Sequence, residues 1–385
     1  MAAKPDYRLP MLPPVSLRFA RDGSDHSYAS AFDRDGVAWC ARGCDALALV
    51  YRQAGLGPDD VVVVPAFHCP SIADATRRAG LRVAFHRIAP DLTPIDSDIV
   101  YQLQGGARAL LLIHYFGFTQ DVTRYRALCD EFGALLIEDC AHTVFGLSGG
   151  LLPGETGHFA IASDRKLFPL PDGGAALANS GPMDAQSLRP VTWSNELRCA
   201  LRAIQHAADY GTLGVASRPL AIALDWMDRL RGSGKKNRQS SPDAGSLPDS
   251  PVEARRPLQR GSRVARRLRR ATSVSRLAQV RRHNYRHLVG RLHGLPNCMP
   301  LFPDLLPGTV PYVVPVLVRN AQQHFGALKA HGVPMFRWEG IGDLGCEVTK
   351  SYSTDLIQLP CHQELSTADI DWIADEIEAA ITGTQ

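Results

Sequence analysis

The chain has 385 residues, of which 45% are hydrophobic and 21% are charged, and its formal net charge is +3. These proportions are ordinary for a globular protein and argue against a chain that binds a polyanion over its whole surface. The length predicts two domains, or one large and one small, with a substantial core.

The 9 cysteines are scattered without framework spacing, which predicts reduced thiols and a cytoplasmic location. The first residues contain no apolar stretch of the kind a signal peptide needs, and no run of about 18 apolar residues occurs. We therefore expect neither a signal peptide nor a membrane-spanning helix.

Residues 1–35 are rich in Pro, Asp and Ser and predict an irregular N-terminal arm. From residue 36 onward, short apolar runs alternate with helical stretches. This alternation predicts an α/β fold with a mostly parallel sheet covered on both faces. Strands are expected at 61–64, 82–86, 109–114 and 134–137, and helices at 46–54, 72–79 and 121–132.

The pattern changes at residue 232. Residues 232–272 are polar and rich in Gly, Ser, Pro and Arg, which predicts a flexible insertion. A basic helix at 281–292, a strand at 312–318 and helices at 321–331 and 366–381 then predict a small α/β domain. The expected organisation is an arm (1–35), a large domain (36–231), the insertion (232–272) and the small domain (273–385).

Two segments suit a bound phosphate. Gly43, Cys44 and Asp45 open a predicted helix, whose free N–H groups and positive dipole end attract anions. Ser163, farther along the chain, could donate a further hydrogen bond. An ordinary turn with Asp45 as helix cap is the plainer interpretation of the first segment.

Two further residues suit the ring and carbonyl of pyridoxal 5′-phosphate (PLP). Asp139 ends an apolar strand, where ligands of parallel sheets collect, and its carboxylate could pair with a protonated ring nitrogen. Lys166 stands before a Pro/Gly-rich loop, where a desolvated lysine can form a Schiff base. An exposed acid and a surface lysine are the plainer alternatives, but the order of the three segments is more specific than any one of them.

The chain resembles the DegT-type sugar aminotransferases, a family of fold-type I PLP enzymes. The resemblance covers about residues 36–381, with a gap across the insertion. It implies a large PLP-binding domain and a smaller C-terminal α/β domain. The matching stretches are GCDALALVYRQAGLGPDDVVVVPAFHCPSIADATRRAG, LLIHYFGFTQD, LLIEDCAHTVFG and SDRKLFPLPDGG, followed in the tail by RRHNYRHL, HGVP and LPCHQELSTADID.

The resemblance implies roles for single residues. Lys166 matches the lysine that binds PLP covalently, Asp139 the acid that faces the pyridinium nitrogen, and His142 a Gln or His that contacts the ring hydroxyl. Ser163 lies near the phosphate-binding serine, with a shorter spacing to the lysine. The segment from 43 to 45 matches a Gly-Thr-Asp phosphate turn in which a cysteine here replaces the threonine.

The residue that stacks on the cofactor ring is less defined. The family often has an aromatic residue at the position of Cys69, so His68 or Phe67 could take its place. A block that reaches the phosphate of the neighbouring subunit has no clear match. Because the active site of this fold type forms at a dimer interface, a homodimer is expected.

The resemblance implies an aminotransferase that converts a keto group, on a nucleotide-linked sugar, to an amine with an amino acid, glutamate, as donor. Lys166 would move the proton during the exchange. Alternatives are a PLP enzyme of the same fold acting on a non-sugar carbonyl or catalysing dehydration, although dehydratases of the family replace the lysine with histidine. A non-catalytic binding or regulatory homologue is a further alternative.

Arginine is concentrated in and after the insertion. A nucleic-acid partner is disfavoured because no recognition motif accompanies the charge. A solvated basic face, or a channel for an anionic substrate, is preferred. His114 and His362 are expected to be structural, and Arg337 could meet a substrate carboxylate. The clustered arginines are Arg255, Arg256, Arg260, Arg263, Arg266, Arg267, Arg269 and Arg270.

Overall fold

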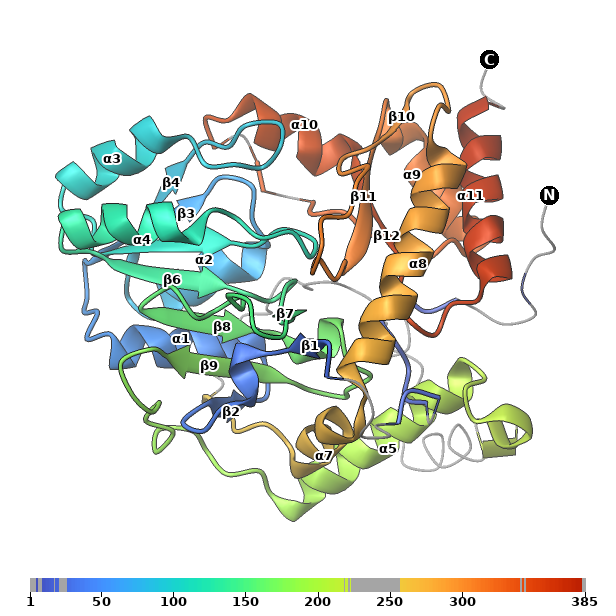
Figure 1. Cartoon of the computed structure of the whole chain (residues 1–385), viewed down its shortest axis with the longest axis horizontal. Helices are drawn as coiled ribbons and strands as arrows, with labels where there is room; N and C mark the ends of the chain where they lie inside the picture. The colour runs from blue at the N-terminus through green and yellow to red at the C-terminus, as the bar shows by residue number, and fades with distance from the viewer. Residues whose placement is uncertain are drawn as a thin grey trace.

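The computed structural model describes residues 5, 9–16, 18–20, 26–217, 219–220, 222, 257–339, 341–342 and 344–382. Within these ranges the chain forms a large sheet with helices on both faces and a smaller sheet packed against further helices (Figure 1). No described helix is long and apolar enough to cross a membrane.

The larger sheet has the strand order β2-β9-β8-β6-β5-β3-β4. Neighbouring strands from β8 to β4 run parallel, whereas β9 is antiparallel to both β8 and β2. This arrangement confirms the predicted α/β fold with a mostly parallel sheet. The strands are β2 (Ala38–Cys40), β3 (Val61–Pro65), β4 (Arg82–His86), β5 (Ala109–Ile113), β6 (Leu135–Asp139), β8 (Phe159–Ala162) and β9 (Gly174–Ala178).

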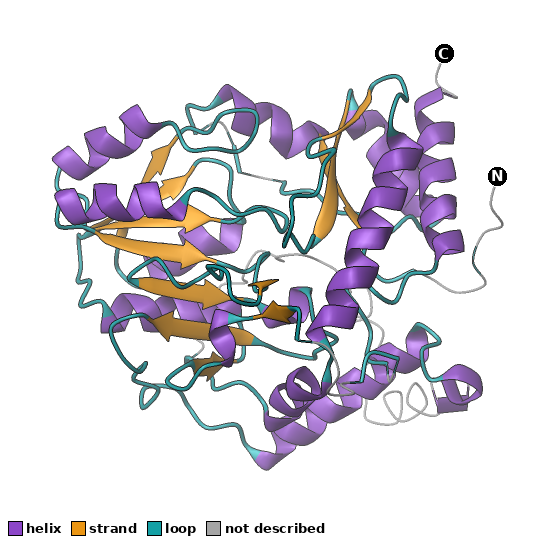
Figure 2. Ribbon diagram, in the orientation of Figure 1, coloured by secondary structure: helices purple, strands orange, loops and turns teal. Residues whose placement is uncertain are grey.

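Helices cover both faces of this sheet, as Figure 2 shows. Val62 belongs to a core cluster with residues of α1 and α2, while its neighbour Val63 belongs to a second cluster with residues of α3 and α4. Leu111 and Leu110 alternate in the same way on β5. Strands buried on both faces are therefore apolar at successive positions. The helices on the two faces are α1 (Gly43–Gln53), α2 (Pro70–Arg78), α3 (Asp96–Gln104) and α4 (Val122–Glu131). Helix α5 (Trp193–Asp209) packs against α7 (Arg263–Ala271) instead (Figure 1).

Helix α3 has no counterpart among the predicted elements. Only Ile99 and Leu103 of this helix are buried. They are one helical turn apart, so the apolar stripe is too narrow to stand out in the sequence.

The C-terminal part contains an antiparallel sheet with the order β10-β11-β12. Its core joins Tyr285 and Leu288 of α8 to Ile370 and Ile373 of α11. Helix α8 begins before the predicted basic helix. The elements are α8 (Val274–Leu292), β10 (Cys298–Pro300), β11 (Val313–Val318), α9 (Ala321–His331), α10 (Glu347–Asp355), β12 (Leu356–Pro360) and α11 (Thr367–Thr382).

The predicted arm and insertion both contribute to the fold. Leu9 lies in the C-terminal core, and the short strand β1 (Tyr28–Ala29) pairs with β7 (Gly146–Leu147). Residues 223–256 lie outside the described part of the chain, but α7 (Arg263–Ala271) lies within the stretch expected to be flexible. The stretch predicted as an insertion therefore contains a basic α-helix over these residues. The short 3-10 helices η1 (Ala31–Asp33), η2 (Asp164–Lys166) and η3 (Gly214–Ala216) complete the described elements.

Candidate active site

Lys166, Asp139 and His142 lie together where neighbouring parallel strands end. Asp139 is the last residue of β6 and pairs with Ile161 of β8. The chain leaves β8 through the 3-10 turn η2, which ends at Lys166. Nζ of Lys166 lies 2.9 Å from Nε2 of His142, in the loop after β6. The structure thus brings three of the predicted residues to one edge of the sheet.

The environment of Lys166 favours its uncharged form. Burial lowers the pKa of the amine below its usual range, and the positive charge of Arg165 acts in the same direction. The negative charge of Asp139 opposes this shift, as a thiolate at Cys69 would. A larger fraction of Lys166 is therefore an uncharged amine, the form that attacks a carbonyl.

Asp139 has one oxygen engaged and one available. The Ala141 N–H donates to its Oδ1 at 2.9 Å. Among the residues that the structure describes, no hydrogen bond to Oδ2 is present. Burial raises the pKa of this carboxyl, while the nearby Lys166 lowers it. A protonated ring nitrogen placed at Oδ2 would supply the missing donor and stabilise the carboxylate.

His142 is held between aromatic rings. Its imidazole stacks on Tyr312, with ring centroids 4.6 Å apart, and on Phe116 at 5.7 Å. Trp338 lies tilted at 5.7 Å. Burial lowers the pKa of His142 well below its usual range, and the charge of Lys166 adds to this effect. The ring is therefore neutral at physiological pH.

The first turn of α1 lies beside the residues before Lys166. A Cβ atom added to Gly43 would lie 3.4 Å from Cβ of Ser163, so these two segments are adjacent as the phosphate prediction requires. Asp45 is buried and accepts two hydrogen bonds from the Arg42 guanidinium, at 3.1 and 3.3 Å. The Cys44 side chain is half-buried.

The three residues considered for stacking on the cofactor ring have different surroundings in the structure. Nδ1 of His68 lies 2.9 Å from the Pro65 carbonyl, and its ring stacks on Phe85 of β4. These contacts hold His68 against the sheet. Phe67 packs on Trp338 at 4.9 Å. Cys69 is close enough to Lys166 for the two groups to interact electrostatically.

Two residues that the sequence did not single out also reach Lys166. The Tyr312 ring lies 5.6 Å from Nζ of Lys166. Arg281 of α8 is fully buried and donates to the carbonyls of Lys166 and Leu167, at 3.3 and 3.0 Å, and of Pro311 and Tyr312. Burial lowers its pKa to about 10. Nothing in the sequence assigned either residue to the site. Tyr312 stands at the start of an apolar stretch that predicts a strand, and Arg281 lies in a run of basic residues that predicts a helix.

Residues 30–189 match the model of the DegT/DnrJ/EryC1/StrS aminotransferase family. This part of the chain is similar to the members of that family. The dTDP-4-dehydro-2,3,6-trideoxy-D-glucose 4-aminotransferase of Saccharopolyspora spinosa is 33% identical over 145 residues, which are 37% of this chain and 38% of that protein. A pleiotropic regulatory protein of Geobacillus stearothermophilus is 29% identical over 144 residues, 36% of this chain and 39% of that protein. The matched region thus spans less than half the length of these relatives.

The fold likeness extends over nearly the whole chain. The protein Spr1654 of Streptococcus pneumoniae, solved in its PLP form, matches with a TM-score of 0.65 at 14% identity, covering 98% of this chain and 100% of that one. Identity this low shows the fold alone. It confirms the predicted fold-type I architecture, with a mostly parallel sheet and a smaller C-terminal α/β part.

The DegT family depends on PLP, and the residues present fit that group. Lys166 supplies an amine, Asp139 a carboxylate oxygen without a described donor, and the Gly43–Ser163 contact a narrow turn without side-chain bulk. These are the functional groups that the carbonyl, the ring nitrogen and the phosphate each require.

A glycine next to this turn gives a first prediction. A Cβ atom at Gly174 would overlap the Arg42 carbonyl oxygen and lie 2.8 Å from the Gly43 nitrogen. Gly174→Ala should therefore push α1 from its place, lower the free energy of unfolding by about 1–3 kcal/mol and weaken PLP binding. Urea unfolding and PLP titration would measure both. Gly290→Ala, in α8, is the matched control, because a Cβ atom there would contact no atom outside the helix's own backbone. An equal loss of stability and PLP binding in this control would contradict the explanation.

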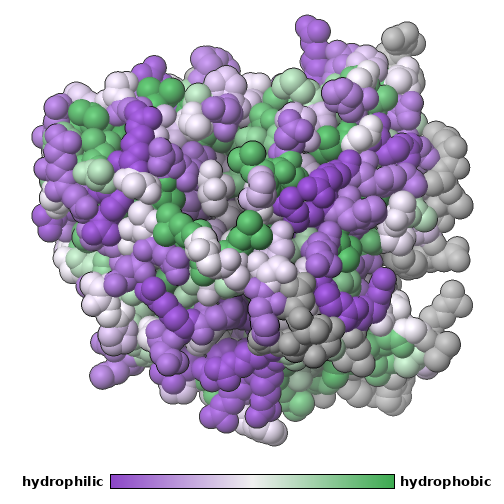
Figure 3. Space-filling view, viewed as in Figure 1, coloured by the Kyte–Doolittle hydropathy of each residue, from purple (hydrophilic) through white to green (hydrophobic). Residues whose placement is uncertain are grey.

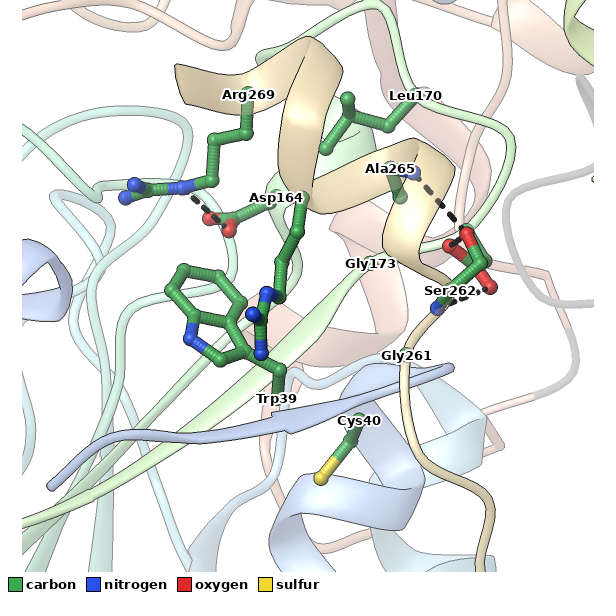
Figure 4. A pocket seen from close by; sticks show the side chains of 11 residues that line it. Trp39, Cys40, Asp164, Leu170, Gly173, Gly261, Ser262, Ala265 and Arg269 are labelled. Carbon is green, nitrogen blue, oxygen red and sulfur yellow. Dashed lines mark hydrogen bonds and ion pairs between the residues drawn. The ribbon is translucent and has the colours of Figure 1, made fainter. Parts of the chain in front are cut away.

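The arginine-rich stretch is not one solvated face. Arg269 is buried, and Figure 4 shows its guanidinium against Asp164, at 2.8 Å. The guanidinium also forms an ion pair with Asp33, and it lies over the rings of Trp39 and Phe168, 4.9 Å from each ring centroid. The other described members, Arg260, Arg263, Arg266, Arg267 and Arg270, are exposed, and Figure 3 shows hydrophilic side chains gathered over α7. Arg255 and Arg256 lie outside the described residues.

The remaining candidates have structural partners. Nε2 of His114 lies 3.0 Å from Glu138, and Nε2 of His362 lies 2.9 Å from the Pro10 carbonyl. Both histidines are buried, as a structural role requires. Arg337 pairs with Glu339 and stacks on Phe325, so its described contacts are internal.

Proposed function

We propose that this protein is a PLP-dependent aminotransferase that converts a keto group on a nucleotide-linked sugar to an amine, with glutamate as donor. One observation carries the proposal. Lys166 and Asp139 lie at or just beyond the ends of neighbouring strands, close enough to interact electrostatically, and the neutral ring of His142 contacts the Lys166 amine. The relative from Saccharopolyspora spinosa, which is named for a dTDP-sugar aminotransferase, supports the substrate class.

Each residue has a defined task in this proposal. When bound, PLP supplies an electron sink that makes the α-hydrogen of an amino acid acidic. Lys166 holds the cofactor, and its Nζ then accepts and returns the proton that moves during the exchange. Asp139 would hold the protonated ring nitrogen of the cofactor, and the turns at Gly43 and Ser163 would hold its phosphate. The ring of Tyr312 covers the amine and limits its access to water.

A spectroscopic experiment tests the proposal. Purified protein supplied with PLP should absorb visible light, and glutamate should replace this band with the near-ultraviolet band of pyridoxamine phosphate. A nucleotide-linked keto sugar should then restore the first spectrum, whereas the same sugar without its nucleotide should not. Protein that binds no PLP, or a bound cofactor that does not respond to any amino acid, would contradict the proposal.

A regulatory homologue is the second candidate. The relative from Geobacillus stearothermophilus is named a pleiotropic regulatory protein, and Cys44 departs from the phosphate turn that the resemblance implies. Retention of the amine and carboxylate at one edge of the sheet favours catalysis. The same titration separates the two, because a non-catalytic protein would bind PLP without accepting an amino group from glutamate. A keto substrate other than a sugar, the homodimer and the cytoplasmic location stay predictions.

A further inference from the structure

His142 links Lys166 to a backbone amide. The N–H of Phe116 lies 3.2 Å from Nδ1 of His142, and Nε2 of the same ring lies 2.9 Å from Nζ of Lys166. A backbone N–H can only donate a hydrogen bond, so Nδ1 is the acceptor and carries no proton. A neutral imidazole has one proton, which is therefore on Nε2 and directed at Lys166.

This assignment decides the state of the lysine. The N–H at Nε2 needs an acceptor, and only an uncharged amine has a free electron pair. An ammonium at Nζ would face this N–H donor to donor. If the ring proton were on Nδ1 instead, it would face the Phe116 N–H, and two hydrogen-bond donors would again oppose each other. The contacts are therefore all satisfied in one state, with neutral His142 donating to neutral Lys166.

The direction of the Phe116 N–H is fixed by packing. Phe116 has φ of 60°, in the left-handed region that residues other than glycine rarely adopt. Its carbonyl accepts from the Tyr312 N–H at 2.8 Å. A Cβ atom on the next residue, Gly117, would lie 2.5 Å from the Val310 carbonyl oxygen. The turn at Phe116 is thus locked against the start of β11, and the amide cannot rotate away from His142.

Charged groups around Lys166 do not decide its state by themselves. Asp139 on β6 and Cys69 before α2 favour the ammonium, whereas Arg165 on η2 favours the amine. The Tyr312 ring on the β11 side faces Nζ and attracts a cation through its π-electrons. Because these influences oppose one another, a neighbour with fixed hydrogen-bond polarity can determine the outcome.

We propose that His142 is a positioning residue that holds Lys166 as the uncharged amine, ready to capture a carbonyl, by presenting a permanent N–H donor to Nζ. This role rests on the proposed function for its use in catalysis. It is a property of the protein alone, however, and exists before any cofactor binds.

Three substitutions separate polarity from packing. His142→Gln keeps an acceptor for the Phe116 N–H and a donor for Lys166. His142→Phe keeps the aromatic stack with Tyr312 but has no polar atom. His142→Glu offers Lys166 an acceptor with a negative charge. The readout is the acetylation rate of Lys166 by acetic anhydride against pH, in the cofactor-free full chain, measured by mass spectrometry with exposed Lys350 as internal standard.

Lys166 of the wild type and of His142→Gln should become reactive at a lower pH than Lys350. His142→Glu should move the profile upward by about one pH unit, so that acetylation below the midpoint slows roughly tenfold. His142→Phe should lie between them. A His142→Phe profile equal to that of the wild type would assign the effect to stacking and overturn the proposal, as would four identical profiles.

Uptake of PLP by the wild type, followed separately, distinguishes the two proposals. A lysine that reacts at low pH in a protein that never binds PLP would contradict the aminotransferase function and leave the role of His142 standing. A protein that binds PLP while Lys166 titrates like Lys350 would contradict the role of His142 and leave the aminotransferase function standing.

Discussion

Lys166→Ala is expected to abolish covalent attachment of PLP and to lower transamination by at least about 10²–10⁴-fold. The variant loses both the amine that captures the carbonyl and the group that moves the proton at the reacting carbon. Asp139 and the turn at Gly43 are unchanged, so weak non-covalent binding of PLP should persist. Borohydride reduction followed by mass spectrometry would show whether any lysine is still labelled.

Lys350→Ala is the matched control for this substitution. Lys350 is exposed, and its ion pair with Glu347 is 4.0 Å long. Pairs of this kind contribute little to stability, so the control should keep the wild-type spectrum and activity. Covalent attachment of PLP to Lys166→Ala protein, or full activity without the amine, would remove the basis of the proposed function.

Arg269→Met should lower the free energy of unfolding by about 3–5 kcal/mol, because it leaves the buried Asp164 carboxylate without its cation. Asp164 is fully buried, and its Oδ1 has no hydrogen-bond partner among the described residues, so loss of Arg269 also removes the hydrogen bond to Oδ2. Asp164 also begins the turn that ends at Lys166. The variant should therefore take up PLP more weakly as well as unfold more easily. Urea unfolding and PLP titration would measure the two effects.

The pH dependence of Arg269→Met has a definite sign. Burial already raises the pKa of Asp164, and Arg269 opposes that rise. Without Arg269 the folded-state pKa should rise further above the unfolded value. The folded state then binds the proton more tightly, so stability is greatest at low pH and is lost as the pH rises through the folded pKa. The difference in the free energy of unfolding between the wild type and Arg269→Met should be smaller at about pH 5 than at about pH 7.

Two further variants test the cause of this loss. Arg267→Met changes an exposed arginine of the same helix and should stay within about 0.5 kcal/mol of the wild type. Arg269→Met combined with Asp164→Leu removes both charges and should recover much of the lost stability. A double variant as unstable as Arg269→Met alone would show that packing between Trp39 and Phe168, rather than the ion pair, is the cause.

The elements around the site were predictable because each is defined by a local pattern. The strand at 82–86 and the helix at 321–331 coincide with β4 and α9. Their apolar residues recur with the period of the element, so the pattern needs no knowledge of distant segments. The order of the phosphate turn, Asp139 and Lys166 along the chain was sufficient for the family resemblance.

The basic stretch shows where local pattern fails. Composition averages over neighbouring residues, so Arg269 was grouped with arginines that are exposed. Its burial depends on Asp33 and Asp164, which are far away in the sequence. The same reason applies to His68, whose ring lies against Phe85 because β3 and β4 are paired.

The sequence by itself determined that Asp139 ends an apolar strand and that Lys166 follows a second one. Short-range periodicity and the rule that ligands collect at strand ends were enough for this conclusion. Only the tertiary structure decided the protonation of His142, the cover that Tyr312 places over Lys166, and the clamp of Arg281 on the Lys166 carbonyl. Each of these depends on atoms from segments remote in sequence, which only packing brings within hydrogen-bonding distance.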